Sequence, residues 1–93
     1  MRLNNVHQRV IYSHGDKRME VIDRYGQHLF RITPEIAREL VEMEQGTTLR
    51  FHQMQGVHVE VTRVDENTYE LQKIGNRVTF HLTLPTAVQS WAQ

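Results

Sequence analysis

The sequence predicts an α+β protein in which antiparallel β-meander units, with about seven strands in all, accompany one amphipathic helix and a short C-terminal helix. Three observations support this fold class. Apolar and polar residues alternate through several short segments, most regularly in VHVEVTRV at 57–64. The segment PEIARELVEMEQ at 34–45 instead repeats its apolar residues at the helical period. Most connections between strand segments are too short for the crossovers that parallel strands require, so antiparallel pairing is expected.

The first third of the chain is expected to form a three-stranded meander. Its predicted strands span residues 6–12, 17–23 and 28–32. Gly15 and Gly26, each beside polar turn-forming residues, separate these segments. Alternation along the third strand predicts that His28, Phe30 and Ile32 share one face.

A helix is predicted over residues 34–45. Thr33 is suited to the N-cap, and Pro34 to the first helical position, where a missing N–H costs nothing. The apolar arc of this helix consists of Ile36, Ala37, Leu40, Val41 and Met43. Gly46 is expected to end the helix as its C-cap.

The second half of the chain returns to strand periodicity. Its predicted strands span residues 47–54, 57–64, 68–74 and 77–84, and a short helix is expected within 85–93. In the last strand, Val78, Phe80 and Leu82 are expected to face inward. Since 93 residues rarely bury two separate cores, we expect one domain over residues 1–93.

The two halves resemble each other at an offset of fifty residues, which suggests a duplicated βββα unit. The repeat would span residues 6–46 and 57–93. Identical pairs at this offset are Glu20 and Glu70, Phe30 and Phe80, Thr33 and Thr83, and Ala37 and Ala87. Any two meanders that end in a helix share such alternation, so the identities leave both duplication and coincidence open.

Composition narrows the classes of function. The 11 basic and 11 acidic residues cancel, so bulk charge does not predict a strong nucleic-acid binder. The absence of cysteine excludes disulfides, thiolate catalysis and cysteine-ligated zinc. The sequence shows neither the apolar core of a signal peptide nor an apolar run of about 20 residues, so we expect a cytoplasmic protein without a membrane partner.

Candidate catalytic and metal-binding residues are sparse. The six histidines include His52, His58 and His81 on polar strand faces, but no zinc-binding spacing is present. The glycines are isolated, so no phosphate-binding loop is predicted. The sequence therefore predicts no enzyme activity, no metal site and no cofactor, and it leaves open whether these three histidines meet in space.

The N-terminal meander is locally basic. Residues 1–31 carry six basic residues against three acidic ones. Arginines near tyrosines provide the cations and stacking platforms that single-stranded nucleic acid uses. The candidate nucleic-acid-binding residues are Arg9, Arg18, Arg24, Arg31, Tyr12 and Tyr25. Such charges also commonly lie scattered on a solvated face.

Three residues outside the meander are candidate protein-binding residues. Glu42 and Glu44 oppose the negative end of the helix dipole, so either basic side chains of this chain or a partner are expected to pair with them. Trp91 is a residue type common at binding hot spots, and it is equally suited to covering the domain's own core.

The leading hypothesis is a small non-enzymatic protein-interaction module of the cytoplasm, acting as a regulator, adaptor or inhibitor. The alternative is a nucleic-acid-binding regulator that uses the basic meander. Open sheet edges in so short a chain also favour a homodimer. No family resemblance contributes to these expectations.

Overall fold

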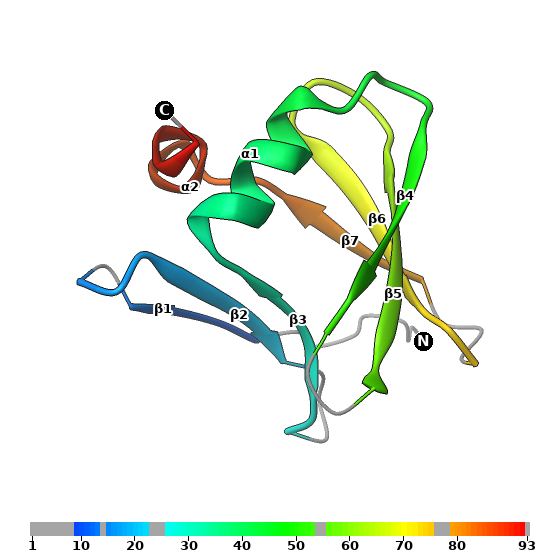
Figure 1. The fold of residues 1–93 in the computed structure, drawn as a ribbon, viewed down its shortest axis with the longest axis horizontal. Helices are drawn as coiled ribbons and strands as arrows, with labels where there is room; N and C mark the ends of the chain where they lie inside the picture. Colours follow the sequence, from blue (N-terminus) through cyan, green and yellow to red (C-terminus); the bar gives the residue numbers. More distant parts are fainter. Residues whose placement is uncertain (1–8, 14, 23–25, 54–55, 76–78, 93) are drawn as a thin grey trace, which may run out of the picture.

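The fold is α+β, with two antiparallel sheets and two helices, as the sequence predicts. The computed structural model describes residues 9–13, 15–22, 26–53, 56–75 and 79–92. The elements within these residues are β1 (Arg9–Ser13), β2 (Arg18–Ile22), β3 (His28–Ile32), α1 (Pro34–Glu42), β4 (Thr48–His52), β5 (His58–Arg63), β6 (Thr68–Lys73), β7 (Thr79–Thr83) and α2 (Thr86–Trp91). Figure 1 shows the two sheets on either side of the molecule, with α1 and α2 side by side across one end.

Each sheet is a meander of strands that are neighbours in the sequence. The N-terminal sheet has the order β1-β2-β3 and the C-terminal sheet the order β4-β5-β6-β7, and every pair is antiparallel. β3 leads into α1 and β7 leads into α2, so the order βββα occurs twice, with β4 between the two units. A common origin for the two units stays a prediction.

One hydrophobic core joins both sheets and both helices. The strands contribute Met19, Val21, Leu29, Phe30, Ile32, Phe51, Val59, Val61, Tyr69, Leu71, Phe80 and Leu82. Phe30 of the N-terminal sheet and Phe51 of the C-terminal sheet meet edge to face, with ring centroids 5.5 Å apart. Phe80 and Leu82 face inward as predicted, and Val78 lies outside the described residues.

A β-bulge in β3 changes which of its residues face the core. The register with β2 shifts by one residue between Val21 and Ile22, and Leu29 is the additional residue in β3. A bulge reverses the alternation of side chains on one side of it. Leu29 and Phe30 are therefore both buried, although they are consecutive. His28 is exposed on the opposite face, so the prediction that it shares a face with Phe30 is wrong.

The helix α1 begins at the predicted residue and ends three residues early. Thr33 is its N-cap, and the Thr33 hydroxyl accepts an N–H of the first turn at 3.4 Å. The helix ends at Glu42, and Met43 has extended backbone. Gly46 is not the C-cap. It lies in the following turn with φ of 86°, and its N–H donates to the carbonyl of Arg63 at 2.7 Å.

The C-terminal end of α1 is bound by Arg63 from β5. The guanidinium donates to four carbonyl oxygens, those of Val41 (3.0 Å), Met43 (2.5 Å), Asp65 (3.2 Å) and Glu66 (2.5 Å). The last carbonyls of a helix lack internal partners and form the negative end of its dipole, so a cation is stabilising there. Arg63 thus supplies the positive charge that the last turn of α1 itself lacks.

Tyr69 on β6 contacts the same helix from the hydrophobic core. Its hydroxyl donates to the carbonyl of Leu40 at 2.7 Å, and burial raises the pKa of Tyr69. Replacing Tyr69 with phenylalanine is expected to lower the free energy of unfolding by about 1 kcal/mol at pH 7, because the buried carbonyl loses this donor.

The pH dependence of this substitution tests the raised pKa. A group whose pKa is higher in the folded state stabilises the protein below its unfolded pKa, about 10 for tyrosine, and loses this contribution as pH rises through the folded pKa. Urea unfolding curves of the wild type and Tyr69→Phe are therefore expected to converge in alkaline solution. An equal gap at pH 7 and pH 11 would contradict the prediction.

Candidate binding groove

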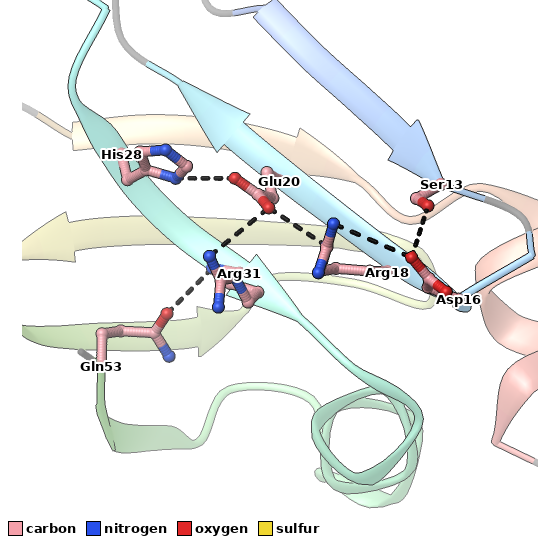
Figure 2. A network of polar contacts seen from close by, with 7 residues as sticks. All are labelled: Ser13, Asp16, Arg18, Glu20, His28, Arg31 and Gln53. Atoms are coloured by element: carbon pink, nitrogen blue, oxygen red, sulfur yellow. Dashed lines mark hydrogen bonds and ion pairs between the residues drawn. The ribbon is translucent and has the colours of Figure 1, made fainter.

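A network of charged side chains lies on the outer face of the N-terminal sheet (Figure 2). At its centre is the carboxylate of Glu20, which is 3.2 Å from Nε of Arg18, 3.5 Å from Nη2 of Arg31 and 2.7 Å from Nδ1 of His28. The side chain of Glu20 is 13% exposed, so its neighbours largely cover it. Arg18 also approaches the carboxylate of Asp16 at 4.0 Å.

Strand geometry brings these groups together. Glu20 and Arg31 are cross-strand partners in the register of β2 and β3, and Arg18 precedes Glu20 by two residues on the same face. His28 joins them because the bulge at Leu29 turns its side chain away from the core. Glu20 thereby orients two of the side chains that line the adjacent groove.

The groove opens between β3 and the ends of three strands of the C-terminal sheet, and its volume is about 460 Å³. Its lining residues are Gln27, His28, Leu29, Phe30, Arg31, Gln53, Val57 and Lys73. Gln53 joins the two sides, because its Oε1 accepts the backbone N–H of Arg31 at 2.9 Å (Figure 2). This volume is in the range of cavities that hold small ligands or a few side chains.

The lining combines basic groups with apolar surface. His28, Arg31 and Lys73 supply basic side chains. The apolar surface comes mainly from the half-buried Val57, since Leu29 and Phe30 are only 4% and 1% exposed. None of the described lining residues is acidic. A guanidinium binds carboxylate or phosphate through paired hydrogen bonds, and an ammonium adds a point charge. The groove is therefore suited to an anionic group carried on an apolar body.

The predicted basic surface is assembled only in part. Arg18 and Arg31 meet at Glu20, but Tyr12 pairs with Met19 in the register and so lies on the opposite face of the sheet. The structure thus separates the tyrosine from the arginines. Arg24, Tyr25 and the side chain of Arg9 lie outside the described part of the structure.

The candidate protein-binding residues lie at the helical end of the molecule. Glu42 and Glu44 are exposed, and Glu44 follows the end of α1 instead of lying in its last turn. The described residues form no ion pair with either glutamate. Trp91 is buried in the core on α2, which is the second of the two roles that the sequence left open.

Two of the three histidines considered as metal ligands meet. His52 and His58 are cross-strand partners on β4 and β5, with ring centroids 4.3 Å apart. His81 lies on the same face but on β7, at the opposite edge of the sheet, where it contacts Glu70 at 3.2 Å. Nδ1 of His58 is buried and has no hydrogen-bond partner among the residues that the structure describes. The described residues contain no group of three or more side chains able to hold a metal ion.

Sequence reasoning did not identify most of the groove. Gln53 and Lys73 are separated from β3 by more than twenty residues, and nothing in their local sequence indicates that they lie beside it. The sequence predicts that His28 shares a face with Phe30, because no glycine or other local signal marks the bulge at Leu29. Among the lining residues, Arg31 alone belongs to a binding surface that the sequence predicts.

Comparison with known protein families, with curated proteins and with solved structures finds no match to this chain. No helix in the described ranges is long and apolar enough to cross a membrane. The functional conclusion therefore depends on the geometry and chemistry of the groove.

Proposed function

We propose that this protein is a small, non-enzymatic, cytoplasmic protein-interaction module whose groove beside β3 holds a short acidic segment of a partner protein. The observation that supports the proposal most directly is the lining of the groove. It places His28, Arg31 and Lys73 around the half-buried side chain of Val57, without a described acidic residue among the lining residues.

Two features favour a peptide over a nucleic acid as the ligand. Glu20 lies between Arg18 and Arg31 and offsets part of their charge, which weakens the attraction for a phosphate backbone. Tyr12 lies on the opposite face from these arginines, so it is not placed to stack a base beside them. A peptide with acidic and apolar side chains in alternation matches both components of the groove.

The proposal is tested by titrating the protein with a labelled peptide that alternates glutamate and leucine, and with its glutamine counterpart, at low salt. We expect fluorescence anisotropy to detect the glutamate peptide alone. Lys73→Glu is expected to weaken binding about tenfold, because an attractive charge becomes repulsive in a partly enclosed groove. Amide shifts in NMR spectra should centre on residues 27–31.

Lys17→Glu is the matched control, because Lys17 is exposed in the turn between β1 and β2 and does not line the groove. It makes the same change in charge, and its affinity for the peptide should stay within about twofold of the wild type. If both variants lost the same affinity for the peptide, the peptide would be attracted by the overall charge of the protein. That result would contradict binding in the groove. Tighter binding of a single-stranded oligonucleotide, with a steep salt dependence, would favour the nucleic-acid alternative instead.

A further inference from the structure

Two histidine side chains meet on the outer face of the C-terminal sheet. His52 on β4 and His58 on β5 are cross-strand partners, and their ring centroids are 4.3 Å apart. The sequence shows no zinc-binding spacing around them, and it is the hairpin of β4 and β5 that brings them together. Imidazole nitrogen is the commonest protein ligand of transition metals, so this pair is a candidate metal site.

The ladder between β4 and β5 places the two histidines where opposite side chains are closest. The N–H of Gln53 donates to the carbonyl of Val57 at 2.6 Å, so these two residues are a hydrogen-bonded pair. Because hydrogen-bonded and non-hydrogen-bonded pairs alternate along an antiparallel ladder, His52 and His58 are a non-hydrogen-bonded pair. Opposite Cα atoms in such a pair are about 4.5 Å apart. Two imidazoles at this position can reach one ion while the backbone stays in register.

The ring separation matches two imidazoles at a right angle around one metal ion. With metal–nitrogen bonds of about 2.1 Å, the centres of two such rings lie about 4.5 Å apart at a right angle and about 5.2 Å apart at the tetrahedral angle. The observed separation of 4.3 Å is closer to the first value. Right angles between ligands are typical of Cu²⁺ and Ni²⁺, whereas Zn²⁺ favours tetrahedral sites.

One nitrogen of the pair is buried without a described partner. Nδ1 of His58 has no hydrogen bond to any residue that the structure describes. A buried polar atom without a partner is unfavourable, and a metal ion beside Nδ1 would supply the missing interaction. His52 is exposed on an outer strand of the described sheet, so its ring can turn about the Cβ–Cγ bond toward the same ion.

The neighbouring charges do not oppose a cation. Arg50 and Glu60 are the next pair on the same face of the ladder, and the guanidinium lies 2.9 Å from the carboxylate, which offsets its charge. The described residues contain no group of three or more metal-binding side chains. The ion would therefore keep water in its other positions, which is typical of exchangeable rather than structural metal sites.

We propose that His52 and His58 bind one exchangeable Cu²⁺ ion through Nδ1 of His58 and a ring nitrogen of His52, with water completing the coordination. Cu²⁺ is the favoured metal because affinity for nitrogen ligands is highest at Cu²⁺ among the divalent ions of the first transition row and falls again at Zn²⁺. Neither histidine lines the groove, so metal binding and peptide binding are independent measurements.

Titration of the full chain with CuCl₂ at pH 7, followed by electron paramagnetic resonance, tests the site. We expect one equivalent of Cu²⁺ to bind with hyperfine splitting from two nitrogen ligands, and Zn²⁺ to bind at least about tenfold more weakly. His52→Gln and His58→Gln should each weaken Cu²⁺ binding at least about tenfold, because each leaves a single imidazole ligand. Circular dichroism should show the wild-type fold for His52→Gln, since His52 is exposed.

His81→Gln is the matched control, because His81 lies on the same face of the sheet but on β7, where it contacts Glu70. Its affinity for Cu²⁺ should stay within about twofold of the wild type. Cu²⁺ binding that is as tight in the folded His52→Gln variant as in the wild type would overturn the proposal. An equal loss of affinity in His81→Gln would do the same, because it would show binding by scattered histidines. Tighter binding of Zn²⁺ than of Cu²⁺ would contradict the right-angle geometry and overturn the assignment of the metal.

Discussion

Replacing Phe30 with alanine is expected to lower the free energy of unfolding by about 3–5 kcal/mol. Phe30 is 1% exposed, and its ring meets Phe51 of the C-terminal sheet edge to face. The substitution removes buried apolar surface and also leaves a cavity between the two sheets, where neither backbone ladder can easily move to fill it. A loss of this size is a large part of the total stability of a small domain.

Urea denaturation followed by circular dichroism measures this effect. Phe30→Leu is the graded control, because it retains most of the side-chain volume and should cost less than about 1.5 kcal/mol. A similar cost for the two variants would show that the volume of the aromatic ring is not what Phe30 contributes. A cost below 1 kcal/mol for Phe30→Ala would contradict the central position of Phe30 in the core.

Replacing Arg63 with alanine is expected to cost about 2 kcal/mol, which is large for a side chain that is not fully buried. The guanidinium donates to four carbonyls, and it also lies over the ring of Tyr69, 5.6 Å from the ring centroid. Loss of the guanidinium removes the cation at the negative end of α1 and exposes the ring beneath it.

Arg38→Ala is the matched control, since Arg38 is exposed on α1 and its Nε makes one long hydrogen bond, at 3.4 Å, to the carbonyl of Ala92. It should cost at most about 0.5 kcal/mol in the same urea assay. Amide hydrogen exchange should speed up most in the last turn of α1 in Arg63→Ala, because local opening begins where the carbonyls lose their donors. If both variants lowered the free energy of unfolding equally, Arg63 would contribute no more to stability than an ordinary surface charge, and the prediction would be wrong.

The sequence predicts the elements of this fold well because each has a local cause. Thr33 and Pro34 define the start of α1 through the geometry of the N-cap. Val59 and Val61 identify β5 by their alternation with polar residues, and both are fully buried. These signals act within a few residues, so they are present in the sequence itself.

The features that the sequence does not predict depend on contacts between distant residues. At the early end of α1, the carbonyls of Val41 and Met43 accept hydrogen bonds from Arg63, which is twenty residues further along the chain than Met43. The bulge at Leu29 has no local marker, and it moves His28 to the groove. Lys73 and Gln53 become neighbours of β3 only when the two sheets pack together. Most of the candidate site is therefore a product of tertiary structure.

The boundary between the two sheets also determines how the groove can deform. Within the described residues, no strand of one sheet forms backbone hydrogen bonds with a strand of the other. The side chain of Gln53 spans this boundary through its single contact with the N–H of Arg31. Opening this rim would break the contact of Gln53 and disturb the packing of Phe30 on Phe51, while the backbone hydrogen bonds within each sheet stay intact. Within the described residues, the two walls of the groove are therefore joined to each other by side-chain contacts, whereas each wall is joined internally by backbone hydrogen bonds.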